Sequence, residues 1–408
     1  MANLDLGEIY RGQVWKSDSA ISKGAQRMGL RISTDEQEIR QIADSWNSLC
    51  LNPNSDLEHY LLVCRLRKEV LSPWVVSVGD GGECKAIIAG RIEDTVLRPK
   101  IGYLRLPGIR VRTLVIIYEG VLGVVGNEEA EAFCNAVLGT FREHQIQVIT
   151  FNHLSDRHFA LWEALRNFKH SVGLLNPDWS PHRALNIQGD PGVLFKKMSR
   201  KHRIWIKSRE RKLNEVFEGA VVWHWEKEFD DLGKMCDRVE AVARRTYQRG
   251  LGAGFVDNEE TRQRLSLFGQ RGMLRLTFLE GKNRPLSFRL TVIYKGTGYA
   301  SGTGYLPEVA EFRVGTLTLC NTVEQLAGEG ISRLDYGLGD ADYKKRFSDT
   351  EWREATFHIF APDWKGKILR SYMAMADTID RKLRKLATQG GLSERIKKRW
   401  RNVLRPSP

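Results

Sequence analysis

The run of residues 273–328 constrains the fold more than any other part of the chain. It holds three apolar segments, each long enough for one strand: Met273–Glu280, Leu286–Tyr294 and Gly298–Gly304. The asparagine and proline of residues 283–285 and the glycines of residues 295–298 supply the turns between them. An apolar stripe at helical spacing then covers residues 314–328. The pattern predicts antiparallel strands followed by a helix that packs on them.

The first half of the chain shows the same order of elements. Its periodicity predicts helices over 35–50 and 56–69, strands over 74–78, 84–92 and 112–118, a helix capped by Asn127, a strand over 147–151 and a helix over 156–168. The second half predicts helices over 191–213, 228–246 and 258–270 before the strands above, and strands over 331–336 and 356–361 after the last helix. We therefore expect two similar α/β lobes with a boundary between Pro177 and Pro191.

Length and composition fit two cytoplasmic domains. The chain has 408 residues, and its 42% apolar content allows each half to bury a core. The six cysteines are scattered without metal-ligand spacing, so we expect reduced thiols and no metal site. No signal peptide or membrane span is recognisable, so we expect a cytoplasmic protein, at most attached to the inner membrane surface. The net charge of +13 favours a polyanionic partner.

The junction between the third strand and the last long helix is the first candidate site. A helix start offers unpaired backbone N–H groups, and glycine lets a phosphate approach them. Arg313, Val314, Gly315 and Thr316 stand at this start, with Tyr305 upstream. The residues suit the pyrophosphate of a coenzyme A thioester. The alternative is an ordinary helix start with a packing glycine.

The loop after the strand over 331–336 is the second candidate site. It gathers Asp335, Asp340, Tyr343 and Lys344 around glycines at a strand end. A carboxylate there can accept a proton from an attacking group, and Lys344 can bind an anion or stabilise an oxyanion. The alternative is a tight turn followed by a solvated helix.

Two basic segments are the third candidate. Residues 196–212 carry nine lysines and arginines against Glu210 alone, and residues 381–405 are also strongly basic. Such faces can bind RNA, lipid or donor phosphates, or can simply be solvated. Other patterns exclude common enzyme classes: the chain has no GxSxG and no HExxH, and the glycines at 250–254 follow a helix rather than a strand.

Three of these segments resemble a known family. They are Met198–Arg203, Gly315–Leu317 and Asp335–Phe347, in which Tyr343-Lys344 and Phe347 match the family pattern. The stretch from about 194 to 347 resembles the acetyltransferase-like domain of the CelD/BcsL group of the GNAT superfamily, and is similar to Fem-type peptidyltransferases. The chain has Arg313-Val314 where the family often has Ser-Pro.

The resemblance implies a fold of tandem GNAT-like lobes, each a mixed, mostly antiparallel sheet flanked by helices. The expected parts are a flexible arm (1–28), a degenerate N-terminal lobe (29–185), a catalytic C-terminal lobe (186–362) and basic C-terminal helices (363–408).

The resemblance also implies direct acyl transfer from acetyl-CoA or another acyl-CoA to a saccharide hydroxyl or an amine, in polysaccharide or envelope biosynthesis. Asp335 or Asp340 would be the base, Tyr343 and Lys344 would assist, the residues from Arg313 to Thr316 would bind the donor, and Arg200, Arg203 and Tyr305 would bind substrate. Two alternatives stay open: a Fem-like transferase that uses aminoacyl-tRNA, and a non-catalytic partner of a polysaccharide synthase at an anionic membrane.

Overall fold

The computed structural model describes residues 29–80, 83–102, 104–168, 173–174, 177–246, 249 and 254–389. The predicted N-terminal arm, most of the glycine loop at 250–254 and the basic residues beyond 389 lie outside the described residues. Within the described part, no helix combines the length and the apolar content that a bilayer crossing requires. The six cysteines form no disulfide, and four of them are buried.

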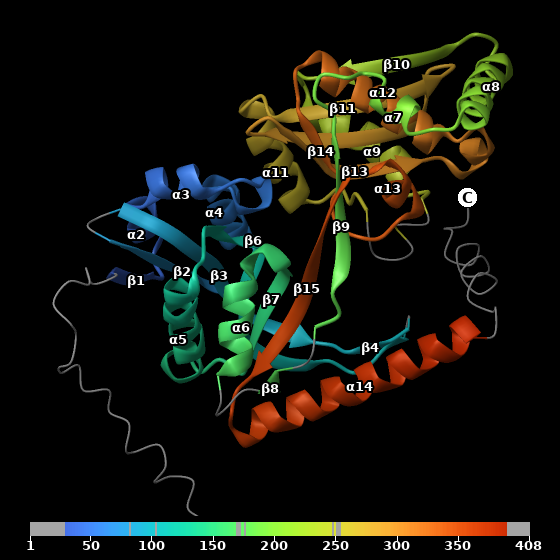
Figure 1. The fold of residues 1–408 in the computed structure, drawn as a ribbon. Helices are drawn as coiled ribbons and strands as arrows, with labels where there is room; N and C mark the ends of the chain where they lie inside the picture. The colour runs from blue at the N-terminus through green and yellow to red at the C-terminus, as the bar shows by residue number, and fades with distance from the viewer. Residues whose placement is uncertain are drawn as a thin grey trace, which may run out of the picture.

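One large sheet runs through both halves of the molecule (Figure 1). Its strands in spatial order are β1 (Gly29–Ser33), β2 (Val70–Asp80), β3 (Glu83–Leu97), β6 (Ile109–Gly123), β7 (Val148–Ser155), β15 (Thr350–Phe360), β9 (Ser180–Asn186), β14 (Arg333–Asp335), β13 (Thr297–Tyr305), β12 (Arg284–Tyr294), β11 (Leu274–Gly281) and β10 (Val221–Glu226). β8 (Gly173–Leu174) also pairs with β15, and β4 (Lys100–Ile101) pairs with β5 (Leu104–Arg105) separately. Among the strands that the structure describes, only β6–β7 and β13–β14 are parallel pairs.

Helices cover both faces of this sheet. In the first half they are α2 (Glu36–Arg40), α3 (Ala43–Leu49), η1 (Pro53–Ser55), α4 (Leu57–Leu66), α5 (Asn127–Glu143), η2 (Asp156–His158) and α6 (Phe159–Asn167). In the second half they are α7 (Val193–Lys196), α8 (Arg200–Val216), α9 (Leu232–Ala243), α11 (Glu259–Gln270), η3 (Pro307–Phe312), α12 (Val314–Gly328), α13 (Asp342–Phe347) and α14 (Trp364–Gln389). The architecture confirms the expected α/β class with a mostly antiparallel sheet flanked by helices.

The two halves share their sheet instead of each closing its own. β15, from the end of the second half, pairs with β7 on one side and with β9 on the other. β9 in turn pairs with β14. β9 was not expected from the sequence, because His182, Arg183, Ala184 and Leu185 are all buried and the strand therefore lacks the usual alternation of apolar and polar residues.

Several helix boundaries differ from the prediction, and the helix expected over 191–213 is the two helices α7 and α8. The helix expected over 35–50 is two short helices, α2 and α3, separated at residues 41–42. Asn127 is the first residue of α5 and not its cap. Gly126 precedes the helix, and its N–H donates to Glu129 Oε2 at 3.0 Å, so the side chain that closes this helix start lies one turn inside it.

The helix α12 fixes one face of the C-terminal sheet. Its Thr318 and Thr322 hydroxyls hydrogen-bond Ser287 of β12 and Thr277 of β11 at 2.6 and 2.7 Å. These two strand positions therefore face α12. The start of α12 is thereby held at the end of β13, which is where the first candidate site was predicted.

Candidate functional site

The strands β13 and β14 pair only briefly and then diverge. Their parallel register covers Thr297–Tyr299 against Arg333–Asp335. Beyond it β13 continues to Tyr305, whereas the segment that follows β14 turns away at Gly337 and Gly339, with φ of +69° and +92°. We call this divergence the C-terminal notch.

The start of α12 forms one side of the C-terminal notch. Arg313 has a left-handed backbone with φ of +58°, and no side chain caps the helix. The first helical bonds run from Thr316 N and Leu317 N to Arg313 O, so the N–H groups of Val314 and Gly315 donate to no described residue. The Val314 side chain is buried, and a Cβ on Gly315 would lie 3.1 Å from the Tyr305 ring. These two backbone N–H groups can therefore bind an oxyanion, whereas the Val314 side chain cannot reach one.

The first turn of α8 lies beside this helix start. The Arg313 guanidinium sits 5.2 Å from the Trp205 ring centroid. Burial, and then the charges of Arg346 and Arg313, lower the pKa of His202, so that α13 and the start of α12 each bring a positive charge near it. Arg203 donates to Phe195 O at 3.2 Å, and Arg200 is exposed at the first position of α8. The predicted substrate-binding residues Arg200 and Arg203 thus belong to the helix whose Trp205 contacts Arg313, and we call these three arginines the basic rim.

Asp335 forms the other side of the C-terminal notch. It ends β14 and is 6% exposed. Its Oδ1 accepts hydrogen bonds from Gly337 N at 2.7 Å and from His182 Nε2 at 2.6 Å. Its Oδ2 has no hydrogen-bond partner among the described residues. One oxygen is fixed and the other remains able to accept a proton from an incoming group.

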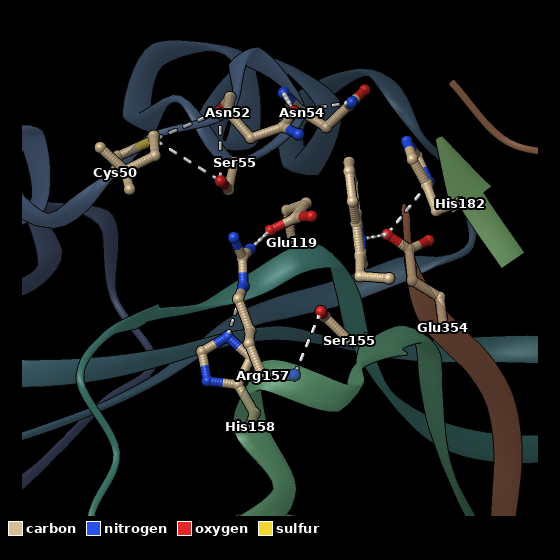
Figure 2. Close-up of polar contacts among 12 residues, drawn as sticks. Cys50, Asn52, Asn54, Ser55, Glu119, Ser155, Arg157, His158, His182 and Glu354 are labelled. Atoms are coloured by element: carbon tan, nitrogen blue, oxygen red, sulfur yellow. Dashed lines mark hydrogen bonds and ion pairs between the residues drawn. The ribbon is translucent and has the colours of Figure 1, made fainter. Parts of the chain in front are cut away.

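His182 connects Asp335 to a second buried carboxylate. Its Nδ1 lies 3.1 Å from Glu354 Oε1, an ion-pair contact, and its ring stacks on Trp352 at 4.3 Å. Figure 2 shows His182 and Glu354 facing one another at the junction of the two halves. Burial alone would lower the pKa of His182, but the hydrogen bonds and charges of Asp335 and Glu354 outweigh it and raise the pKa to about 9. His182 is therefore an imidazolium at neutral pH.

The remaining residues of the loop hold its shape. Lys344 is buried, and its Nζ donates to Gly337 O and Leu338 O at 2.8 and 2.6 Å. Burial and the charge of Arg289 lower the pKa of Lys344 to about 8. Asp340 is half-exposed and pairs with the buried Arg183, which also binds Glu351 at 3.0 Å. Asp340 and Lys344 thus act on the loop itself.

Tyr343 has an unpaired hydroxyl among the described residues. Its ring packs edge-on against Tyr336 at 5.8 Å, and its hydroxyl makes no hydrogen bond to a described residue. The side chain is half-buried. It can therefore donate its proton, or orient an acceptor, without first breaking a contact within the protein.

The first half contains an equivalent divergence that is filled. β6 and β7 pair over Thr113–Ile116 and Val148–Phe151 and then separate. An ion pair between Arg157 and Glu119 crosses this point (Figure 2). The space left among these residues is about 10 Å³. That volume is about the room needed for one water molecule. The divergence of β6 and β7, which we call the N-terminal notch, therefore has no space for a larger group in this conformation.

One protein-family comparison matches part of the second half. Residues 200–345 match the acetyltransferase (GNAT) domain family. The match covers α8 through α13, and so contains both sides of the C-terminal notch. No curated protein matches the chain.

Solved structures show the same tandem fold. FemX is 12% identical and has a TM-score of 0.56 over 84% of this chain and 100% of its own. A tandem GNAT protein from the clavulanic acid biosynthesis pathway is 10% identical, with a TM-score of 0.47 over 81% and 98%. The C-terminal domain of a putative lysylphosphatidylglycerol synthetase from Agrobacterium fabrum is 9% identical, with a TM-score of 0.48 over 84% and 96%. At such identity the likeness to FemX shows the fold alone.

The structure places the predicted residues on α8, at the start of α12 and in the loop after β14, and adds others. His182, Glu354 and Arg183 were missed, because β9 gave no strand signal and β15 was predicted to begin only at residue 356. The one available signal for these residues was that β9, a strand that its pattern does not predict, carries buried ionisable side chains.

Proposed function

We propose that this protein is a GNAT-type acyltransferase that moves an acyl group from acyl-CoA to a hydroxyl or amine at the C-terminal notch. The supporting observations are the unpaired Val314 and Gly315 N–H groups at the start of α12 and the open Oδ2 of Asp335 at the end of β14. The reaction requires a binding site for the anionic donor and a group that accepts a proton. The N–H groups provide the first and Asp335 provides the second. The GNAT match over 200–345 supports the same reaction.

In the proposed reaction the donor phosphates bind the start of α12 and the rim of Arg313, Arg203 and Arg200. The acceptor oxygen or nitrogen attacks the thioester carbonyl, its proton passes to Asp335 Oδ2, and the carbon–sulfur bond breaks. The departing thiolate takes a proton from Tyr343 or from water. Lys344 keeps the loop in place. Transfer is direct, without a covalent enzyme intermediate, and the site contributes mainly by holding the reactants in attack geometry.

The acceptor and the setting are narrower proposals. The resemblance to the CelD/BcsL group supports a saccharide or amine acceptor in polysaccharide or envelope biosynthesis, inside the cell. The alternative donor is an aminoacyl-tRNA, which the basic face of α8 would suit. In that case the phosphates at the α12 start would belong to the tRNA acceptor end.

Ligand-induced thermal stabilisation tests the donor. Acetyl-CoA, longer acyl-CoAs and aminoacyl-tRNA are added separately to the purified full chain. We expect acyl-CoA at about 100 times its Kd to add about 3 kcal/mol to the folded state, a rise of several degrees in Tm. Arg313→Ala should reduce this shift at low salt. Stabilisation by aminoacyl-tRNA alone would instead select the second donor.

The long helix α14 supports attachment to a membrane surface. It lies along one edge of the molecule (Figure 1), where Leu369 and Ala376 hold it against the rest of the protein. A second face exposes large apolar side chains, with Trp364 67% exposed: Trp364, Ile368, Met375, Ile379 and Leu383. A third face exposes basic side chains: Lys367, Arg370 and Arg381. An apolar stripe beside a basic face suits a helix lying in an anionic lipid surface.

Vesicle binding tests this attachment. We expect the full chain to co-sediment with phosphatidylglycerol-containing vesicles and to bind pure phosphatidylcholine vesicles at least about ten-fold more weakly. Exchange of Trp364 and Ile368 for serine should weaken binding by a similar factor, while Val124→Ser, at an 85% exposed position elsewhere, should not. Equal binding to both vesicle types, or none, would refute an anionic lipid partner.

A further inference from the structure

Arg289 is a buried arginine without a partner. It lies in β12, is 2% exposed, and forms no ion pair with a described carboxylate. Its Nε and Nη1 are enclosed and make no hydrogen bond. An arginine side chain keeps its charge in proteins, so burial cannot be relieved by loss of a proton.

The two other fully buried arginines of the described residues have carboxylate partners, whereas the partly buried Arg264 and Arg333 also leave an enclosed Nε without a hydrogen bond. Arg91 pairs with Glu93 at 2.7 Å, and Arg183 pairs with Asp340 and Glu351. Both are about as enclosed as Arg289. Removal of a guanidinium from water is costly unless a carboxylate or other acceptors replace the lost hydration. Carboxylates provide that compensation for Arg91 and Arg183 but not for Arg289.

The position of Arg289 explains what could compensate it. It stands opposite Thr303 of β13, beyond the last residues at which β13 pairs with β14. Ser287, two residues earlier, bonds to α12, so Arg289 also faces the α12 side of the sheet. Its charge acts on Lys344 and Tyr336, which belong to the opposite side of the C-terminal notch. The guanidinium therefore lies on the α12 side of the sheet, close enough to the Asp335–Lys344 loop for its charge to act there, and we call this place the floor of the notch.

Among the described residues, no carboxylate forms an ion pair with this charge. Asp335 Oδ1 is held by His182 and Gly337, its open Oδ2 makes no ion pair with the guanidinium, and Lys344 adds a second cation. Among the described residues, the enclosed Thr291 hydroxyl on the same face of β12 also lacks a partner. An uncompensated cation with further unpaired polar atoms beside it is the arrangement of a site whose anion arrives with a ligand.

We propose that Arg289 binds a carboxylate of a substrate, so that one of the two reactants is an acid. The proposal rests on the acyl transfer proposed above. The donor phosphates belong to the outer rim at the α12 start, which leaves the floor for a group near the reacting atoms. Two sources fit: the free carboxylate of a dicarboxylic acyl group, or the carboxylate of an acceptor such as an amino acid or a uronic acid.

Binding measurements on the full chain separate these sources. In the donor arm, Kd values for succinyl-CoA, acetyl-CoA and free CoA are compared. In the acceptor arm, glucuronate and glycine are titrated into protein saturated with acetyl-CoA. We expect at least ten-fold tighter binding of the carboxylate-bearing ligand in one arm. Arg289→Met should abolish that preference, Arg289→Lys should keep part of it, and Arg284→Met, at an exposed position of the same strand, should leave it unchanged.

The stability of the unliganded variants gives an independent readout. Because the charge is uncompensated in the free protein, Arg289→Met should melt at the same temperature as the wild type or higher. A strongly lowered Tm or failure to fold would mean that the guanidinium stabilises the free protein, and would overturn the proposal. Equal binding of all ligands in both arms would also overturn it.

Failure of the acyl transfer itself has a different signature. In that case no CoA species binds, while succinate and glucuronate added alone still raise the Tm of the wild type and not that of Arg289→Met. Stabilisation by inorganic phosphate but by no carboxylate would count against the carboxylate and identify a phosphate site instead.

Discussion

Asp335→Asn is expected to lower kcat for acyl transfer by at least about 100-fold, because it removes the proposed proton acceptor while leaving the side chain the same size. The amide can still accept a hydrogen bond from Gly337 N, as Oδ1 does at 2.7 Å in the native protein. It cannot take the proton of an attacking hydroxyl or amine. Release of CoA from acyl-CoA in the presence of acceptor measures the rate, and the melting transition shows whether the variant is folded.

The matched control for this exchange is Asp342→Asn. Asp342 begins α13 in the same loop, is exposed, and makes no hydrogen bond to a described residue. We expect its rate to stay within about two-fold of the wild type, since surface exchanges away from specific contacts have small effects. A similar loss in both variants would point to the net charge of the loop, and an unchanged rate in Asp335→Asn would remove Asp335 as the base.

Both sides of the notch could be predicted because each depends on a local pattern. The α12 start follows from a strand, a short connection and an apolar helix in sequence order, and Gly315 stands where that helix begins. Asp335 follows from an apolar strand that ends in glycines. The fold class followed from the repeated order of helices and strands. None of these inferences needed the pairing of distant strands.

The partners of Asp335 could not be predicted, since they depend on distant pairing. His182 and Asp335 are separated by 153 positions, and they meet only because β9 inserts between β14 and β15. The register of such strands is set by turn geometry and by burial of both faces, which a single sequence does not show. The sequence pattern places Arg289 within an apolar strand and gives no sign of its partners. Its lack of a partner is visible only when the neighbouring strands are in place.

The pH dependence of unfolding should reveal the His182 pair directly. Because the pKa of His182 is raised to about 9 from its ordinary 6.5, the folded state holds this proton more tightly than the unfolded chain. The resulting stability is fully present below pH 6.5 and is lost as the pH rises through about 9. A shift of this size corresponds to about 3 kcal/mol. Urea unfolding between pH 6 and 10 measures it.

Comparison of the wild type with His182→Gln separates the contribution of His182 to the free energy of unfolding from the contributions of other titrating groups. Lys344 acts in the opposite direction, because its pKa is lowered to about 8 and stability is regained as the pH rises from 8 toward 10.5. Burial also lowers the pKa of His153, so that group affects stability only below pH 6.5. The difference between wild type and variant should therefore shrink between pH 6.5 and 9. If the variant does not fold, titration of the His182 ring proton by NMR in the wild type gives the same answer, and a midpoint below 6.5 would show that Asp335 and Glu354 do not hold an imidazolium between them.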